Sequence, residues 1–316
     1  MSAPLVETVG LKKYFKTKRG MLHAVEDIDL KIYPGQTLGV VGESGCGKST
    51  LGRTILRLQP ATAGKILYEG EDILKFGKRD MRKIHLNMQM VFQDPYSSLD
   101  PRMSVRSLVS EPIEVCGLLK SKTEINERAE HIMEICGLPL NHANLYPHEL
   151  DGGLRQRVGL ARAMAVNPKF IVCDEPVSAL DVSIQAQILN LLMDLQDQQG
   201  LSYMFITHDL CVVKHISDEI MVMYMGQTVE YAKTEEIFAN PLHPYTKALL
   251  QSVPTIDLSR RNRERYTLKG EVSNPIDPAP GCRFAPRRQY ACEKCKGECG
   301  LREVTPGHLV ACAMCG

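Results

Sequence analysis

Short apolar runs alternate with helical patterns along much of the chain. Three of these runs are each followed by a segment with helical periodicity: residues 37–41 by 47–58, residues 170–175 by 183–196, and residues 202–208 by 210–216. Continuously apolar strands that alternate with helices are typical of a mostly parallel sheet covered on both faces. The pattern therefore predicts an α/β fold.

Two segments interrupt this alternation. The first 34 or so residues include "LVETVGL" and "AVEDIDLKIY", in which apolar residues recur at about every second position and predict an added antiparallel β layer. Residues 94 to about 149 include "KTEINERAEHIMEICGL" and predict a helical insertion. This insertion forms the main part of a helical subdomain expected at about 94–165.

The sequence changes character after about residue 251. It becomes polar and is interrupted by prolines in "SVPTIDLSRRNRERYTLKGEVSNPIDPAPGC", which predicts a linker or a loosely packed extension. We therefore expect a main domain of residues 1–250 and a carboxyl-terminal extension of residues 251–316.

Composition narrows the class of protein. The 316 residues include 38 basic and 37 acidic ones, with a formal net charge of +1, which gives no electrostatic reason to expect binding to nucleic acid. No apolar run approaches the ~18 residues of a membrane-spanning helix, and the amino terminus lacks the pattern of a signal peptide. We expect a cytosolic chain that is able to dock on a membrane protein.

The strongest motif is "GESGCGKS" at residues 42–49, between a predicted strand and a predicted helix. It fits the pattern G-x-x-x-x-G-K-[ST], in which backbone N–H groups wrap phosphates. In that chemistry Lys48 reaches the β- and γ-phosphates, and Ser49 supplies an oxygen to Mg²⁺. The predicted nucleotide-binding residues of this loop are Gly42, Glu43, Ser44, Gly45, Cys46, Gly47, Lys48, Ser49 and Thr50.

Polar residues also follow three other apolar runs. Asp174 and Glu175 end the run "FIVCDE", where we expect Asp174 to help hold Mg²⁺ and Glu175 to activate water as a general base. His208 follows "YMFIT" and can bond a γ-phosphate oxygen. Gln93 in "MVFQDP" offers an uncharged amide for both metal and water. Together these residues predict a site that hydrolyses a nucleotide.

Over roughly residues 5 to 250, the motifs occur in the order found in the ATP-binding cassette (ABC) family of ATPases, which the chain resembles. The resemblance implies a RecA-like core sheet with an antiparallel β layer and a helical subdomain. It also implies that Tyr14 in "LKKYF" stacks on adenine and that Gln93 is the Q-loop residue. Asp181 in "SALD" would belong to the D-loop, and His208 would be the switch histidine. Family members form head-to-tail dimers in which two subunits share each ATP.

A narrower resemblance concerns "ANPLHPYTKALLQSVP" at residues 239–254. The segment is similar to the carboxyl-terminal hallmark of ATPase subunits of oligopeptide, dipeptide and nickel importers. The resemblance implies a peripheral subunit on the cytoplasmic face of the membrane, which energises two permease subunits fed by an extracytoplasmic binding protein. In that family a helical insertion near Gln93 receives the coupling helices of the permeases.

Import of oligopeptides or dipeptides is the leading hypothesis for function. Import of nickel or another small solute remains an alternative, because nothing in the chain contacts the cargo. A soluble ABC ATPase without a transport role and an inactive nucleotide-binding partner are further alternatives.

Six of the eleven cysteines lie in the last part of the chain: Cys282, Cys292, Cys295, Cys299, Cys312 and Cys315. The importers carry a similar tail implicated in an iron–sulfur cluster, but here Arg288 stands where the second cysteine is expected. Cys282, Cys295 and Cys312 match that pattern. Cys292 or Cys299 would supply the missing ligand of a [4Fe–4S] cluster. The two C-x-x-C pairs also fit a zinc site, and unmetallated thiols are the third alternative.

The segment "ELDGGLRQR" at residues 149–157 stands at the position of the family signature, Leu-Ser-Gly-Gly-Gln. Asp151 and Leu154 replace the serine and the glutamine, while Gly152 and Gly153 are retained. Asp caps helices about as well as Ser does, so we expect the fold to survive. A carboxylate near the partner's γ-phosphate costs about 1 kcal/mol even at water-like screening. We therefore expect a weakened half-site for the partner's ATP, and a heterodimer with a related ATPase.

Overall fold

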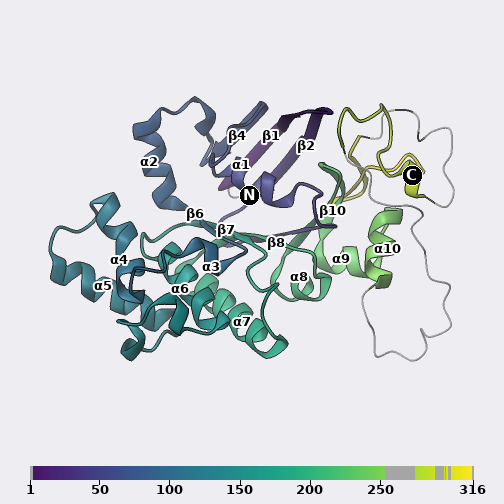
Figure 1. Ribbon diagram of the computed structural model, residues 1–316. Helices are drawn as coiled ribbons and strands as arrows, with labels where there is room; N and C mark the ends of the chain where they lie inside the picture. The colour runs from purple at the N-terminus through teal and green to yellow at the C-terminus, as the bar shows by residue number, and fades with distance from the viewer. Residues whose placement is uncertain (1–2, 253–274, 289–294, 296, 298–299, 315–316) are drawn as a thin grey trace. The chain divides into compact units, whose positions relative to one another are not determined.

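The computed structural model describes residues 3–252, 275–288, 295, 297 and 300–314 (Figure 1). By their contacts these residues separate into two units. The first unit contains residues 33–36 and 75–204, and the second contains residues 3–32, 37–74 and those from 205 onward. The second unit thus brings the amino-terminal segments together with the carboxyl-terminal extension.

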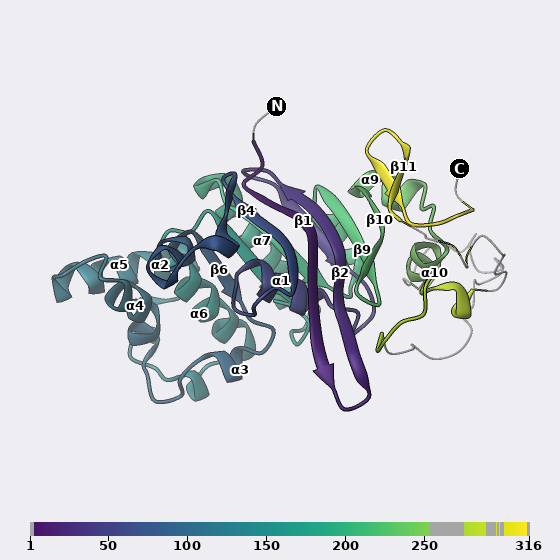
Figure 2. The ribbon, with the colours of Figure 1, turned by 90° about the horizontal axis from the view of Figure 1, so that it is seen from above.

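An antiparallel sheet forms from the first strands of the second unit. Strand β1 (Val6–Thr17) pairs with β2 (Gly20–Ile32) on one side and with β4 (Ala63–Tyr68) on the other. β5 (Glu71–Asp72) completes the strand order β2-β1-β4-β5. β1 and β2 lie side by side as a long hairpin in Figure 2. The predicted antiparallel layer is confirmed.

Parallel pairing begins at β3 (Thr37–Val41), whose five residues are all buried. β3 pairs in parallel with β9 (Glu219–Tyr224), and β10 (Gln227–Lys233) pairs antiparallel to β9. Helix α1 (Lys48–Ile55) follows β3 along the chain, and α8 (Leu210–Ile216) packs against β3. A strand buried on both faces needs apolar residues at successive positions, which explains the continuous apolar run at 37–41.

The carboxyl-terminal extension adds strands to this sheet. β12 (His308–Val310) pairs with β10, and β11 (Arg302–Thr305) pairs with β12, so the order within the second unit is β11-β12-β10-β9-β3. Helices α9 (Thr234–Ala239) and α10 (Pro244–Ser252) and a 3₁₀ helix at Ala285–Arg287 precede these strands. Residues 302–310 of the extension are therefore part of the sheet, whereas the sequence suggested a linker or a loosely packed extension.

The first unit contains the predicted helical insertion. β6 (Met88–Val91) pairs in parallel with β7 (Phe170–Asp174). The helices of this unit are α2 (Lys78–Asn87), α3 (Pro95–Ser98), α4 (Val105–Cys116), α5 (Lys122–Ile135), α6 (Gly152–Met164) and α7 (Val182–Gln199). α5 contacts α4 and α6 (Figure 2) with a face of apolar residues at helical spacing, which are Ile125, Ala129, Ile132 and Met133. The helical character of the insertion is confirmed.

Strand β8 (Ser202–Thr207) begins in the first unit and ends in the second, and all six of its residues are buried. The three apolar runs of the sequence thus correspond to β3, β7 and β8. Among the described residues, no helix is long and apolar enough to cross a membrane.

Candidate active site

The predicted phosphate loop joins β3 to α1 in the second unit. Gly47 precedes α1 with a left-handed φ of 106°, and a Cβ at this position would lie 2.1 Å from the carbonyl oxygen of Ala24. Only glycine permits so close an approach of two backbone segments in this conformation. The start of a helix such as α1 offers backbone N–H groups that can bind an anion. The loop therefore has the local geometry that a phosphate-binding turn requires.

Lys48 is buried within this loop, with 4% of its surface exposed. Its Nζ donates to the carbonyl oxygens of Gly42 at 2.8 Å and Glu43 at 3.0 Å, and it lies 3.8 Å from Sγ of Cys46. Burial raises the pKa of the Cys46 thiol, so the thiol stays neutral beside the ammonium group. The ammonium group is thus held by the loop that we predict to bind phosphates.

Three predicted residues come together at the ends of two strands in the first unit. Asp174 ends β7 and is fully buried, and Glu175 follows it with a φ of 46°, a conformation that side-chain-bearing residues adopt at a cost. Gln93 follows β6, and its Nε2 donates to Oε2 of Glu175 at 2.9 Å. Because β6 and β7 are parallel neighbours, their carboxyl ends bring these side chains together. The oxygens of Asp174 and Gln93 are of the hard type that Mg²⁺ prefers.

The D-loop and switch residues predicted from the family resemblance lie in different units. Asp181 in the first unit caps α7, where its Oδ1 accepts from the Ser183 hydroxyl at 2.6 Å and from the Ile184 N–H at 3.0 Å. These hydrogen bonds lower the pKa of Asp181. His208 in the second unit directly follows β8 and is exposed. Asp181 therefore stabilises the first turn of α7 as its N-cap.

Tyr14 belongs to a network in the second unit. Its ring stacks on that of His23, with centroids 4.1 Å apart, and its hydroxyl donates to Glu26 at 2.5 Å. His23 and Arg283 also bond the Glu26 carboxylate. Burial opposes ionisation of Glu26, but the hydrogen bonds from Tyr14 and His23 and the charge of Arg283 outweigh it, so the pKa of Glu26 is lowered. The sequence did not single out Glu26 or Arg283.

The signature segment begins α6 in the first unit. Asp151 is the N-cap, and its Oδ1 accepts from the Leu154 N–H at 2.8 Å. A Cβ on Gly153 would lie 2.7 Å from Cγ2 of Ile184 at the start of α7, so glycine also permits close helix packing here. The expected capping by Asp151 is confirmed. Gly152 is the first residue of the same helix.

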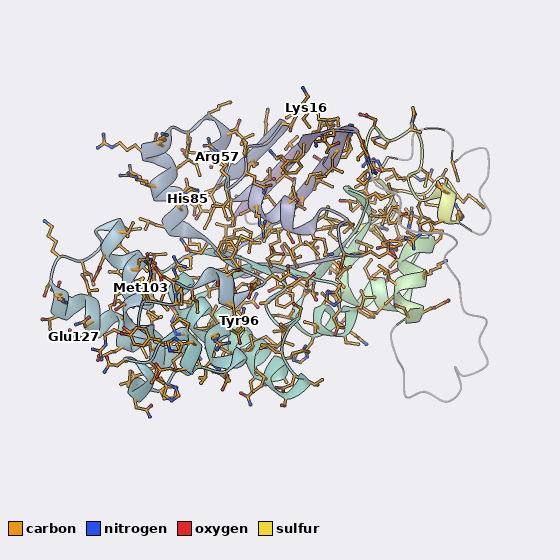
Figure 3. The ribbon with its side chains drawn as sticks, in the orientation of Figure 1. Lys16, Arg57, His85, Tyr96, Met103 and Glu127 are labelled. Atoms are coloured by element: carbon orange, nitrogen blue, oxygen red, sulfur yellow. The ribbon has the colours of Figure 1, made fainter. Side chains whose placement is uncertain are left out.

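A cation–π contact links the signature helix to α3. The guanidinium carbon of Arg155 lies 3.8 Å from the ring centroid of Tyr96, and Nε of Arg155 donates to the carbonyl of Pro147 at 2.6 Å. Tyr96, which is labelled in Figure 3, is 67% exposed, whereas Arg155 is buried. Because α3 follows closely after Gln93, this contact joins the Q-loop segment to the signature segment within one unit.

Comparison with known proteins agrees with these motifs. The family model described as ABC transporter matches residues 25–178, and the model described as oligopeptide/dipeptide transporter, C-terminal region, matches residues 229–295. The chain is 48% identical to the oligopeptide transport ATP-binding protein OppF of Bacillus subtilis (strain 168), over 99% of this chain and 97% of that protein. The chain belongs to the ABC transporter family. As a member of this family, it is an ATPase that uses ATP and Mg²⁺.

Another relative and two solved structures agree with this assignment to the ABC family. The dipeptide transport ATP-binding protein DppF of Haemophilus influenzae is 46% identical, over 98% of this chain and 97% of that protein. The dimeric ATP-binding cassette MJ0796 bound to ADP and Pi has a TM-score of 0.67 and 28% identity, over 72% of this chain and 98% of that one. CbiO1 from Clostridium perfringens, part of the ABC transporter complex cbiONQ, has a TM-score of 0.67 and 26% identity. The match covers 76% of this chain and 92% of that one. The predicted ABC ATPase fold is confirmed.

The described part of the cysteine tail of this ABC ATPase shows no site for the predicted cluster. Nη1 of Arg288 lies 3.8 Å from Sγ of Cys295 and 3.7 Å from Sγ of Cys312, and a cation between two thiols competes with metal for the same sulfurs. Within the described ranges, no group of three or more His, Cys, Asp or Glu side chains could hold a metal ion. Cys292 and Cys299 lie outside those ranges.

Two contacts to the phosphate loop were missed from the sequence. The hydroxyl of Tyr245 accepts from the backbone N–H of Glu43 at 2.8 Å, and Arg287 bonds the Glu43 carboxylate. Tyr245 belongs to the importer hallmark at residues 239–254, which is the one signal that could have pointed to it. Nothing in the sequence pointed to Arg287.

Proposed function

We propose that this chain hydrolyses ATP to drive the import of oligopeptides or dipeptides through membrane permeases. The observation that carries the proposal is the hydrogen bond between Gln93 and Glu175 beside the buried carboxylate of Asp174. A carboxylate that can act as a base bonds an amide, and the preceding residue carries a carboxylate of the type that can hold Mg²⁺, which supports the proposal. The peptide cargo is supported by identities of 48% and 46% with oligopeptide and dipeptide transport ATP-binding proteins.

In this proposal the loop of residues 42–50 binds the phosphates of ATP. Lys48 balances the charge of the β- and γ-phosphates. The ligands for Mg²⁺ are Ser49, Gln93 and Asp174, and the metal, when bound, neutralises charge that develops on the phosphate oxygens.

The remaining side chains act on water, the γ-phosphate and adenine. Glu175 accepts a proton from the attacking water, and Gln93 orients that water and Glu175 through its amide. His208 bonds the γ-phosphate, and Tyr14 stacks on adenine with the ring face opposite His23. The metal centre predicted for the tail has no part in this proposal, because Cys295 and Cys312 contact Arg288.

The experiment that tests the proposal measures hydrolysis and uptake together. The chain is reconstituted in proteoliposomes with its cognate permeases and binding protein, and uptake of a labelled tripeptide and of nickel ions is followed. We expect ATP-dependent uptake of the peptide, which Glu175→Gln should lower about 10²- to 10⁴-fold while ATP binding is kept. Glu235→Gln, at an exposed position of α9 outside the helical insertion, is the control. Uptake of nickel but not of peptide would contradict the cargo.

The helical insertion is the surface that we propose to face the permeases. It exposes several large apolar side chains, which are Tyr96, Val115, Leu118 and Leu140. Val115, near the end of α4, is 80% exposed. Contact with the permeases would cover these side chains and hold the chain as a peripheral subunit on the cytoplasmic face of the membrane.

We also propose that the functional dimer is a heterodimer. Asp151 and Leu154 replace two residues of the family signature, so this chain completes its partner's ATP site poorly, while its own site keeps Lys48, Glu175 and His208. Restoring the signature with Asp151→Ser and Leu154→Gln should therefore raise turnover at the partner's site. Turnover is assigned by removing the general base of one subunit at a time. A larger effect at this chain's own site would contradict the asymmetry.

A further inference from the structure

The carboxyl-terminal extension contacts the phosphate loop through one arginine. Nη1 and Nη2 of Arg287 donate to the two carboxylate oxygens of Glu43, at 2.7 and 3.2 Å. The side chains of Arg287 and Glu43 are 9% and 26% exposed, so the pair is largely withdrawn from water. A two-point contact between guanidinium and carboxylate fixes both the position and the orientation of the carboxylate.

Glu43 is also held through its backbone. Its N–H donates to the hydroxyl of Tyr245 at 2.8 Å, and its carbonyl oxygen accepts from Nζ of Lys48 at 3.0 Å. Tyr245 is fully buried. Two of the residues that bond Glu43, Tyr245 and Arg287, therefore belong to the carboxyl-terminal part of the chain.

Aromatic packing fixes the turn that carries Arg287. Phe284 is buried and meets Tyr224 edge-on, with ring centroids 5.3 Å apart, and it lies 5.6 Å from the ring of Tyr245. Arg283 on the same turn donates to the carbonyl oxygen of Met225 at 2.5 Å. The turn that carries Arg287 is thus anchored by the packing of Phe284 and by the hydrogen bond from Arg283.

The charge of Glu43 poses a difficulty for binding ATP. A carboxylate in a phosphate-binding loop repels the phosphates, by about 1 kcal/mol at 4 Å under water-like screening and by more in a partly dry site. The guanidinium of Arg287 lies against this carboxylate and balances its charge. Without that balance the loop would present a negative charge close to its ligand.

We propose that Arg287 is a positioning residue for ATP, which holds the phosphate loop through Glu43 and cancels the charge of that carboxylate. The inference rests on the proposed role of residues 42–50 in binding ATP. It makes the carboxyl-terminal extension a part of the nucleotide site. A pair that only anchored the extension would give the same effect on ATP binding whichever of its two members was changed.

The test replaces each member of the Arg287–Glu43 ion pair in turn. All variants are made in the full-length chain carrying Glu175→Gln, which prevents turnover of ATP. Arg287→Met keeps the apolar stem but leaves the Glu43 charge unbalanced, so we expect the Kd for MgATP to rise about fivefold. Glu43→Gln removes the carboxylate, so we expect the Kd to fall below that of the parent chain. The double variant should return toward the parent value. Titration calorimetry measures each Kd, and the differences should shrink as salt is added.

Two outcomes would overturn the proposal. One is an unchanged Kd in Arg287→Met, and the other is a rise of equal size in both single variants at every salt concentration. If Arg287→Met does not fold, Glu43→Gln decides alone, because weaker binding of MgATP by that variant contradicts a role in balancing charge. Arg102→Met is the matched control, since Arg102 pairs with Asp100 in an exposed contact of the first unit.

Lys48→Ala separates this inference from the proposed function. ATP binding that survived Lys48→Ala would overturn the assignment of the phosphate loop itself. Loss of binding in Lys48→Ala together with an unchanged Kd in Arg287→Met would overturn only the role of Arg287.

Discussion

The side-chain amide of Gln93 donates a hydrogen bond of 2.9 Å to the carboxylate of Glu175. Gln93 follows β6 and stands just before α3, at the start of the helical insertion, whereas Glu175 follows β7. The bond therefore connects the proposed general base to the segment that we propose to face the permeases. The contact between Tyr96 and Arg155 extends this connection to the signature helix.

Gln93→Ala is expected to uncouple transport from ATP binding. The substitution removes the bond to Glu175 but leaves the phosphate loop intact, and a hydrogen bond to a charged group is worth about 1.5 to 3 kcal/mol. We expect uptake in proteoliposomes to fall at least about tenfold, while the Kd for MgATP changes little. Gln198→Ala, at an exposed position of α7, is the control. Equal losses of uptake and of ATP binding would contradict the coupling role.

Asp151→Ala is expected to destabilise the fold, whereas Asp151→Ser is not. Asp151 caps α6 by accepting from the Leu154 N–H, and the serine hydroxyl can take over this bond. We expect the alanine variant to lose about 1 kcal/mol of unfolding free energy, as measured by urea denaturation. If the two variants were equally destabilised, the carboxylate of Asp151 would contribute to the free energy of unfolding through an interaction other than helix capping.

Tyr14→Ala is expected to weaken ATP binding much more than Tyr14→Phe. Stacking of a base on an aromatic ring contributes about 1 to 3 kcal/mol, so the alanine variant should bind ATP at least about fivefold more weakly. Phenylalanine keeps the ring and loses only the hydrogen bond to Glu26. Calorimetric titration with MgATP compares the two. A Kd raised equally in both variants would assign the effect to the Glu26 network.

The elements that carry the candidate site could be predicted because their signals are local. The run at residues 37–41 became β3, and "GESGCGKS" lies between β3 and α1 as its chemistry requires. Gln93 and Glu175 lie 82 positions apart, yet both follow buried strands, and parallel strands bring such positions together. The roles of these residues toward ATP stay predictions.

The contacts of the extension could not be predicted, because they join residues far apart in sequence. Arg287 and Glu43 lie 244 positions apart, and neither residue type signals such a pairing by itself. β11 and β12 have only four and three residues, which are too few to give a periodic pattern. The turn that carries Arg287 packs through Phe284 and Tyr245. Their ring contacts form only when distant parts of the chain fold together.

His243 is expected to make the stability of the chain depend on pH. Burial first, and then the charge of Arg288, lower the pKa of His243 to about 3, whereas an unfolded histidine takes up a proton near pH 6.5. The unfolded state therefore binds more protons between these values. The contribution of His243 to the free energy of unfolding is fully present above about pH 6.5. It decreases by about 1.4 kcal/mol for each pH unit below that value.

The measurement for His243 is urea denaturation at several pH values between 7 and 5 or so. His243→Asn keeps an acceptor for the Tyr245 N–H, which now bonds Nδ1 at 3.1 Å, and removes the titrating ring. We expect a shallower fall in stability for this variant than for the wild type. His148→Asn, at an exposed position, should leave the slope unchanged. Parallel curves for His243→Asn and the wild type would rule out this contribution.

Arg288→Cys is expected to complete an iron–sulfur site in the tail. The guanidinium of Arg288 lies between the thiols of Cys295 and Cys312, at the place where the importer pattern has its second cysteine. The substitution removes the cation and adds a thiolate ligand near Cys282 in sequence. After anaerobic purification, we expect the visible absorbance of a cluster, together with bound iron, in the variant only.

Arg302→Cys is the control for the Arg288 prediction, because it also exchanges an arginine of the tail for a thiol. Arg302 donates to the carbonyl oxygen of Cys312 at 2.8 Å, whereas Arg288 contacts sulfur, so we expect no absorbance from the Arg302 variant. A coloured wild-type protein that contains iron would contradict the prediction. It would mean that Cys292 and Cys299 complete a cluster with the remaining cysteines, and that Arg288 leaves the sulfurs when the metal binds.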